Sequence, residues 1–357
     1  MKNNIYAYTL EELQAFFSEN NEAKFRASQV YNWLYQKRVN SFAQMNNLSK
    51  RALDLLTEHF DIEILTFVLK QESIDGTIKF LFKVRDHHFI EAVLMKHDYG
   101  YSVCVSTQIG CKMGCTFCAS TISGVVRNLD SGEIMAQVIE IQKYLDNANE
   151  RVSSLVLMGS GEPFDNYDNV IKFINLVNND HTLNIGARHI TVSTSGIVPR
   201  IYDFADLNLQ VTLAISLHAT TNTVRSLIMP INRRYPLEEL IKAIKYYNDK
   251  TKRRVTLEFG LLNDVNDSIA EALRLGDLIK PLLCHVNVIP INDVSERKHK
   301  KPSLSRIKQF VETLEKQGIN ATIRKELGSD IDAACGQLRA KKASLIRRRM
   351  YAKRINY

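Results

Sequence analysis

The sequence has no long uninterrupted apolar run, which excludes a membrane-spanning helix of about 18 or more such residues. The amino-terminal residues also lack the apolar core and the small-residue cleavage site of a secretory signal. We therefore expect a cytoplasmic protein with no membrane partner. Cysteine is scarce, with six among 357 residues, and four of the six fall between positions 104 and 118. This uneven placement excludes a disulfide framework and favours a metal site.

Acidic residues are fewer than basic ones, 39 against 47, which gives a formal net charge of +8. The excess is local, because residues 339–357 contain eight Lys or Arg side chains and no acidic one. Basic clusters of this kind suit the phosphate backbone of a nucleic acid, although a solvated terminal helix has the same composition. Charge alone leaves both interpretations of this basic tail open.

A chain of this length is long enough for two domains, or for one large domain with an extension. Residues 1–90 begin with three helical patterns, the first of which carries Thr9 and Glu12 at the spacing of a capping box. Two alternating stretches follow, with Asp75-Gly76 as the turn between them. We predict a small helical accessory domain and an antiparallel hairpin, with elements at 9–17, 25–38, 48–60, 62–71 and 77–84.

From residue 90 onward, short apolar strands alternate with helical patterns, which is typical of a parallel sheet. About six such units favour an α/β partial barrel of the (β/α)6 kind over residues 91–338. Functional groups of barrels collect at the carboxyl ends of their strands. The expected strands are 89–95, 102–106, 154–158, 189–194, 211–216, 255–261, 285–290 and 321–324, and the expected helices are 131–145, 167–178, 236–248, 268–280 and 303–317.

The most informative motif consists of Cys111, Cys115 and Cys118 on one short loop that also contains Gly110 and Gly114. Three thiolates so close together can converge on one soft metal centre. With three protein ligands, an iron–sulfur cubane keeps one iron open for a substrate. The alternative is a structural zinc site with a fourth ligand elsewhere, but such sites usually pair two CxxC-like arms, and the sequence has no second arm.

Small and polar residues follow several predicted strands. Gly161 and Glu162 end one strand, Ser193 the next, and Ser216, Leu217 and His218 the one after, while Asn292 follows the strand at 285–290. Each alone is more often a turn residue, but a barrel would direct all of them into one cavity. Cys335 stands among alanines, where a lone cysteine is usually a small buried apolar residue.

The cysteine spacing, with Phe117 before the third cysteine, resembles the radical S-adenosylmethionine (SAM) enzymes. The resemblance implies a [4Fe-4S] cluster whose open iron binds SAM and whose electron cleaves it to a 5′-deoxyadenosyl radical. It also implies that the segment Gly159–Pro163 holds the amino group of SAM.

Several further segments, among them FRASQVYNWLY, GCKMGCTFCAS, AISLHA and DIDAACGQL, resemble the RlmN/Cfr family of RNA methyltransferases over nearly the whole chain. This resemblance implies methylation of adenine C2 in 23S ribosomal RNA at the peptidyl transferase centre, and of the adenosine 3′ of the anticodon in some transfer RNAs. An electron donor such as flavodoxin is expected from the family. The amino-terminal helices and the basic tail would hold the RNA.

The resemblance also implies residue roles. Cys335 would take a methyl group from one SAM and, after hydrogen abstraction, add it to the base. Cys104 would then release the product by forming a transient disulfide with Cys335, and Glu91 would accept the C2 proton. The implied SAM contacts are Gly161, Glu162, Ser193, Ser216, Leu217, His218 and Asn292.

Two alternatives remain at this stage. A Cfr-like enzyme would methylate adenine C8 with the same cysteines, although Pro163 follows the C2 pattern. A non-enzymatic RNA-binding protein with a structural metal would leave Cys335 inert. Ser160 departs from the methionine usual between the two glycines of the family, which puts the packing beside SAM in doubt.

Overall fold

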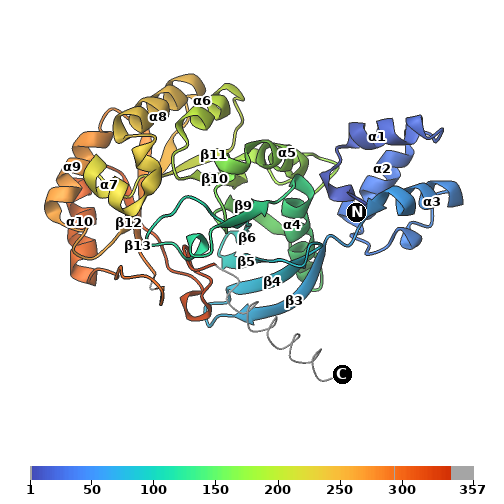
Figure 1. Cartoon of the computed structure of the whole chain (residues 1–357), viewed down its shortest axis with the longest axis horizontal. Coiled ribbons are helices and arrows are strands. Elements are labelled where there is room, and N and C mark those ends of the chain that lie inside the picture. The colour runs from blue at the N-terminus through green and yellow to red at the C-terminus, as the bar shows by residue number, and fades with distance from the viewer. Residues whose placement is uncertain (1, 293, 339–357) are drawn as a thin grey trace.

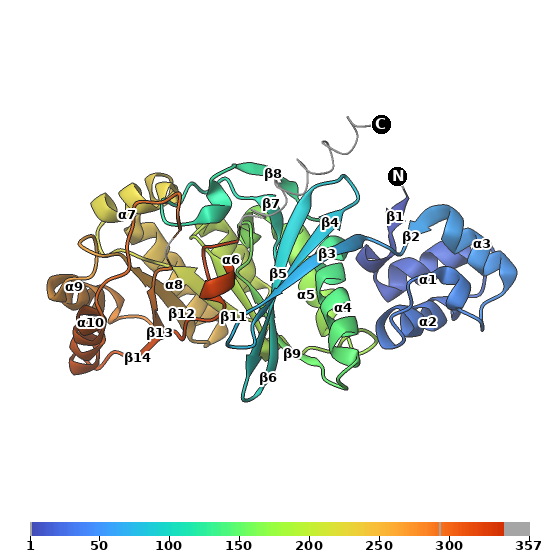
Figure 2. The ribbon, with the colours of Figure 1, turned by 90° about the horizontal axis from the view of Figure 1, so that it is seen from below.

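The amino-terminal residues form a small helical lobe. The computed structural model describes residues 2–292 and 294–338, so the basic tail lies outside the described residues. Helices α1 (Leu10–Glu19), α2 (Arg26–Tyr31) and α3 (Lys50–His59) lie to one side of the larger body in both views (Figures 1 and 2). The capping box is confirmed, because the Glu12 amide donates to Thr9 Oγ1 at 3.2 Å and the Thr9 amide to Glu12 Oε2 at 2.7 Å.

The second predicted helix is wrong in one respect. It ends as an α-helix at Tyr31 and continues as one π-helical turn, Asn32–Gln36. Two short strands, β1 (Asn3–Asn4) and β2 (Phe60–Asp61), pair in parallel and close the lobe. The 3-10 turns of the chain are Ile5–Ala7, Phe42–Gln44, Ala119–Thr121, Pro163–Asn166, Ala187–His189, Pro230–Arg233 and Ser329–Ile331.

The larger body is built on one ten-stranded sheet with the order β14-β13-β12-β11-β10-β9-β6-β5-β4-β3. Neighbours from β6 to β14 pair in parallel, whereas β3 to β6 pair antiparallel. The predicted hairpin therefore extends the same sheet. The strands are β3 (Leu65–Glu72), β4 (Ile78–Val84), β5 (Phe89–His97), β6 (Gly100–Cys104), β9 (Val152–Leu157), β10 (Ile190–Thr194), β11 (Thr212–Ser216), β12 (Val255–Leu261), β13 (Cys284–Pro290) and β14 (Ala321–Ile323).

Helices connect each parallel strand to the next, which gives six strand–helix units and confirms the predicted α/β partial barrel. The helices lie on the outer side of the curved sheet (Figure 1). The sheet order has two ends, at β14 and β3, so the barrel is open. The helices are α4 (Ser131–Asp146), α5 (Tyr167–Asn178), α6 (Val198–Asp206), α7 (Asn222–Ile228), α8 (Leu237–Thr251), α9 (Ile269–Ile279) and α10 (Leu304–Lys316). In the part of the chain that the structure describes, no helix has the length and apolarity of a membrane span.

Side chains alternate along the parallel strands between the barrel interior and the apolar core outside the sheet. Cys104, Val156, Thr191 and Thr212 lie in one register row across β6, β9, β10 and β11. Alternate strand residues such as Val192 are fully buried in the apolar core instead. The interior is thus organised in layers two residues apart along each strand.

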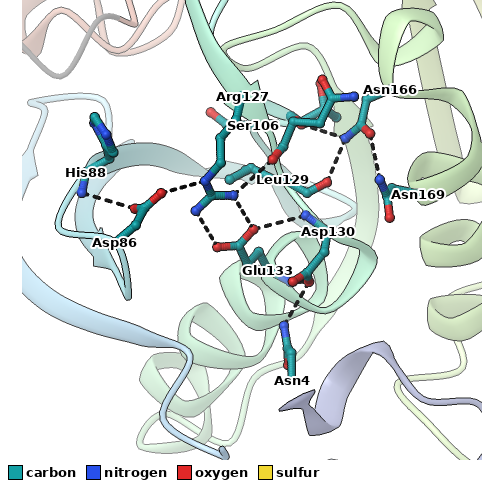
Figure 3. A network of polar contacts seen from close by, with 12 residues as sticks. Asn4, Asp86, His88, Ser106, Arg127, Leu129, Asp130, Glu133, Asn166 and Asn169 are labelled. Atoms are coloured by element: carbon teal, nitrogen blue, oxygen red, sulfur yellow. Dashed lines mark hydrogen bonds and ion pairs between the residues drawn. The ribbon is translucent and has the colours of Figure 1, made fainter. Parts of the chain in front are cut away.

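A polar network joins the amino-terminal segment to the barrel (Figure 3). Arg127 donates to both carboxylate oxygens of Glu133, at 2.7 and 2.8 Å, and to Asp86 at 2.6 Å. Asn4 donates to Asp130 at 2.8 Å. Arg127 belongs to β8 (Val125–Asn128), which pairs with β7 (Gln108–Gly110) in a small hairpin that the sequence analysis missed. The network fixes this hairpin, whose two strands flank the cysteine loop, against the start of α4.

Candidate active site

A cavity lies at the carboxyl ends of β9 to β13, where the barrel prediction placed functional groups. We call it the upper cavity. Most of the predicted site residues meet there, although Leu217 lies behind the wall with a fully buried side chain. The predicted residues that line it are Cys111, Cys115, Cys118, Gly161, Glu162, Ser193, Ser216, His218, Asn292 and Cys335.

The cysteine loop is held over this cavity by its backbone. Gly110 has φ +76°, and a Cβ there would overlap the carbonyl oxygen of Gly124, so the turn requires glycine. Thr121 Oγ1 donates to the carbonyl oxygens of Cys115 and Cys118 at 3.1 and 3.0 Å. Arg297 Nη2 also donates to the Cys118 carbonyl, at 2.8 Å. These contacts fix the backbone at Cys115 and Cys118.

The three thiols are buried together. Burial raises the pKa of Cys111 to about 12 and raises the pKa values of Cys115 and Cys118 as well. Across the described residues, no three His, Cys, Asp or Glu side chains converge closely enough to hold a single metal ion. Thiols that share one cavity wall without converging on a point fit the larger [4Fe-4S] group, and the cluster irons would replace their protons.

Glu162 supplies a buried carboxylate to the same cavity. Its oxygens accept hydrogen bonds from the amides of Ser195, at 2.7 Å, and Phe164, at 3.0 Å. Burial raises the pKa of this carboxyl above its usual range. Gly161 beside it has φ +113°, and a Cβ there would lie 2.7 Å from the amide nitrogen of Gln108. The Glu162 carboxylate could therefore bind a cationic group in the cavity. The absence of a side chain at Gly161 allows the close backbone packing beside it.

Other polar groups in the cavity have unused hydrogen-bonding capacity. Asn292 Oδ1, for example, is buried and has no hydrogen-bond partner within the described residues. His218 accepts a bond at Nδ1 from the Gly260 amide, at 2.7 Å, and burial lowers its pKa to about 3, so its ring is neutral. Buried polar atoms without partners are costly, and here they fit a polar ligand such as SAM.

Cys335 lies where the upper cavity meets a second one, the lower cavity. The lower cavity is lined by Cys104, Thr191 and Thr212. Thr191 and Thr212 precede the upper-cavity residues of β10 and β11 along each strand. The two cavities share Met158, Glu258, Ile289, Asn292, Arg324 and Cys335. Burial raises the pKa of Cys104 to about 12. All six cysteines are free thiols, so the predicted disulfide is absent from this state of the protein.

The segment that carries Cys335 is docked on the cysteine loop. The Ala119 amide donates to the Gly336 carbonyl at 2.7 Å, and Ser120 Oγ donates to the Leu338 carbonyl at 2.7 Å. Asn292 Nδ2 donates to the Cys335 carbonyl at 3.1 Å. The Cys335 backbone is therefore positioned both from the cysteine loop and from the end of β13.

Glu91, like Leu217, lines neither of the two cavities. Its side chain is buried on β5, 3.5 Å from Lys79 Nζ. It lines a separate, smaller hollow with Gln108 and Ser160. Ser120 lines both this hollow and the upper cavity, so the two are neighbours.

Three charged residues of the site were not predicted from the sequence. Arg225 is fully buried and donates to the carbonyls of Ser195, Ser216 and Leu217, at 2.7, 3.0 and 3.0 Å. It thereby fixes the ends of β10 and β11. Glu258 and Arg324 line both cavities. Only Arg324 had a signal in the sequence, as the last residue of a predicted strand.

An open α/β barrel with three cysteines on a loop over its carboxyl end defines the class of radical SAM enzymes, and residues 105–276 match the model of the Radical SAM superfamily. Residues 3–62 match the ribosomal RNA large subunit methyltransferase N-terminal domain. The chain is 58% identical over 340 residues to the probable dual-specificity RNA methyltransferases RlmN of Staphylococcus aureus strains JH9 and Newman, covering 95% of this chain and 93% of each relative. The chain belongs to the RlmN family of radical SAM RNA methyltransferases.

A solved structure supports this assignment. A radical SAM methyltransferase from Sphaerobacter thermophilus superposes with a TM-score of 0.92 at 42% identity, covering 94% of this chain and 99% of that one. The predictions of an enzyme that uses a [4Fe-4S] cluster and SAM are thus confirmed at the level of the family. The non-enzymatic alternative has no support from these relatives.

Proposed function

We propose that this enzyme methylates C2 of an adenosine in 23S ribosomal RNA, and C2 of the adenosine 3′ of the anticodon in some transfer RNAs. The observation that carries the proposal is the position of Cys335. Its side chain opens onto the upper cavity with the cysteine loop and onto the lower cavity with Cys104. A cysteine that receives a methyl group from SAM and is later attacked by a second thiol needs a SAM site on one side and that thiol on the other.

Cys335 acts as the nucleophile in the first step. Its sulfur attacks the methyl carbon of SAM, and S-methylcysteine and S-adenosylhomocysteine result. Glu162 holds the amino group of SAM, the backbone at Gly161 admits it closely, and Asn292 and Ser193 add polar contacts. Ser216 and neutral His218 complete the wall, and Leu217 acts through its backbone. The cluster on Cys111, Cys115 and Cys118, when bound, supplies the electron for radical chemistry.

Cys104 resolves the covalent intermediate in this proposal. Attack of its thiolate on the Cys335 sulfur releases the methylated base and leaves a transient disulfide. The position of Cys104 supports this role, because it lines the lower cavity together with Cys335 and does not line the upper cavity. Glu91 accepts the C2 proton in the same scheme. Its burial next to Lys79 favours a fixed carboxylate, and the shared Ser120 places its hollow beside the upper cavity.

The partners follow from the same proposal. The amino-terminal lobe and the basic tail at 339–357 contact the RNA, mostly through phosphates that position it without specifying the base. Specificity comes from RNA shape and from extrusion of the target base. A flavodoxin-like protein donates electrons, and the reaction takes place in the cytoplasm.

The test is a product analysis. Anaerobically reconstituted enzyme is incubated with SAM, a reductant and a protein-free 23S RNA fragment, and the digested nucleosides are compared with C2- and C8-methyladenosine. We expect C2-methyladenosine from the unaltered enzyme and from Cys284→Ala, and none from Cys335→Ala. Cys284 is a matched control because it is half-buried at the start of β13, outside both cavities. C8-methyladenosine would instead show a Cfr-like enzyme.

A further inference from the structure

Arg324 is a charged residue in hydrogen-bond contact with the proposed methyl carrier. Its backbone continues the β13–β14 pairing, since its amide donates to the Val288 carbonyl at 2.8 Å. Its side chain enters the boundary between the two cavities, where Nη1 donates to Cys335 Sγ at 3.4 Å. The same nitrogen lies 3.8 Å from the sulfur of Met158. The guanidinium therefore touches the atom that would receive the methyl group.

The charge of Arg324 is held in place from the other side. Glu258 is a buried carboxylate that interacts electrostatically with Arg324. Asn287 Nδ2 donates to Glu258 Oε2 at 2.9 Å and so orients that carboxylate. Cys104 lines the lower cavity together with Arg324 and Cys335, so one guanidinium shares a cavity with both thiols of the proposed cycle.

We propose that Arg324 is a catalytic residue that stabilises the thiolates of Cys335 and Cys104 in turn, with Glu258 and Asn287 as its positioning residues. This inference rests on the proposed function for the order of the two steps. A thiolate, rather than a thiol, is the reactive form of cysteine, and a neighbouring arginine favours it. A hydrogen bond from a charged donor is also stronger than one between neutral groups.

In the first step, Cys335 takes the methyl group of SAM. The Cys335 thiol releases its proton to water, its sulfur bonds to the methyl carbon of SAM, and the bond from that carbon to the sulfonium breaks. Arg324 offsets the negative charge that exists on Cys335 before the attack. The methylated sulfur of Cys335 is neutral. Among Cys335, Cys104 and Glu258, only Glu258 then remains as an anion that interacts with the guanidinium.

The second step uses the same cation for the other thiol. The Cys104 thiolate attacks the Cys335 sulfur of the thioether that joins protein and base, so a sulfur–sulfur bond forms and the carbon–sulfur bond breaks. The electron pair of that bond stays on the carbon, which takes a proton from water and becomes the methyl group. The two sulfurs are oxidised by two electrons and the carbon is reduced by the same two.

The test measures thiol reactivity directly and does not depend on turnover. Cluster-loaded enzyme without SAM is treated anaerobically with iodoacetamide near neutral pH, and alkylation of each cysteine is followed by peptide mass spectrometry. We expect Arg324→Met to slow alkylation of Cys335 and of Cys104 by about tenfold. Arg324→Lys, which has a similar length and keeps the charge, should stay within about threefold of the unaltered enzyme.

Two controls separate charge from structure. Lys308→Met removes an exposed cation on α10 that lines neither cavity and should leave both rates unchanged. Cys284 is a reference thiol in every digest. Equal rates in the Arg324→Met and unaltered enzymes would overturn the inference, and a loss of rate in Arg324→Lys as large as in Arg324→Met would overturn the role of charge. If alkylation follows Arg324 while SAM never methylates Cys335, the inference stands and the proposed function fails.

Discussion

At the residue scale, the site buries charged side chains that are held by hydrogen bonds to backbone groups. Glu162 is an example, because backbone amides bind its carboxylate and burial still raises its pKa. A buried carboxylate of this kind gains most from a cationic ligand. The residue therefore serves binding at a cost to stability.

The raised pKa of Glu162 predicts how SAM affinity depends on pH. The ammonium group of SAM binds the carboxylate and not the carboxylic acid, so affinity should fall as the pH drops through the raised pKa. Affinity should be constant between that pKa and the pH at which the amino group of SAM itself loses its proton. Glu162→Gln should weaken binding by about tenfold and abolish this dependence. Equilibrium dialysis with cluster-loaded enzyme measures both. Asp168→Asn, an exposed acid on α5, is the control, and an unchanged pH profile in Glu162→Gln would contradict the assignment.

Glu91 gives a second residue-scale prediction. If it accepts the C2 proton, Glu91→Gln should still acquire a methyl group on Cys335 but should form no methylated adenosine. Peptide mass spectrometry of Cys335 and nucleoside analysis of the RNA separate the two steps. The control is Glu72→Gln, an exposed glutamate on β3. Normal product from Glu91→Gln would remove Glu91 from the mechanism, in line with its place outside both cavities.

The sequence predicted the residues whose chemistry is rare and missed those whose chemistry depends on folding. The cysteine triplet and the polar strand ends follow from spacing and from the barrel rule. Arg225 could not be predicted, because its partners are backbone carbonyls from other elements that only the fold brings together. The role of Glu91 came from the resemblance alone and stays a prediction, and the sequence did not indicate that a separate hollow would hold its side chain.

At the element scale, short apolar runs were enough to predict the barrel strands. Strands that are buried on both faces appear in the sequence as apolar runs, and helices appear as apolar residues repeated at helical spacing. The β7–β8 hairpin lacks such a pattern because its strands are short and its register depends on polar contacts of Arg127. The β3–β4 hairpin has a function that its sequence did not indicate, because it binds the segment before Cys335. The Gly328 amide donates to Asp75 at 2.8 Å, and Lys79 Nζ donates to the Asp332 carbonyl at 2.9 Å. The β3–β4 hairpin thus supports the segment that carries Cys335.

The Arg127 network should be important for stability. Arg127→Met would leave the buried carboxylate of Glu133 without its cation, and we expect a loss of about 2 kcal/mol in the free energy of unfolding. Urea denaturation of the cluster-free protein, followed by circular dichroism, measures it. Arg200→Met removes a more exposed ion pair with Asp203 and should cost less than about 1 kcal/mol. Equal losses in the two variants would show that the network adds nothing specific.

At the scale of the whole molecule, the reaction centre is inside the barrel, whereas the proposed RNA contacts are on the amino-terminal lobe and the basic tail. Removing residues 339–357 should weaken RNA binding and flatten its dependence on salt, because fewer counterions are released. Filter binding at several salt concentrations tests this, with SAM affinity as the control for an intact barrel. An unchanged salt slope would show that the tail does not contact RNA.

The central claim is that Cys335 carries the methyl group to the base, and isotope content tests it most directly. The enzyme is given SAM with a fully deuterated methyl group, and the methylated adenosine is analysed by mass spectrometry. A methyl group carried on Cys335 loses one deuterium before it joins the base and gains one proton from water on release, so the account predicts two deuteriums in the product. Three deuteriums would mean direct transfer from SAM and would contradict it.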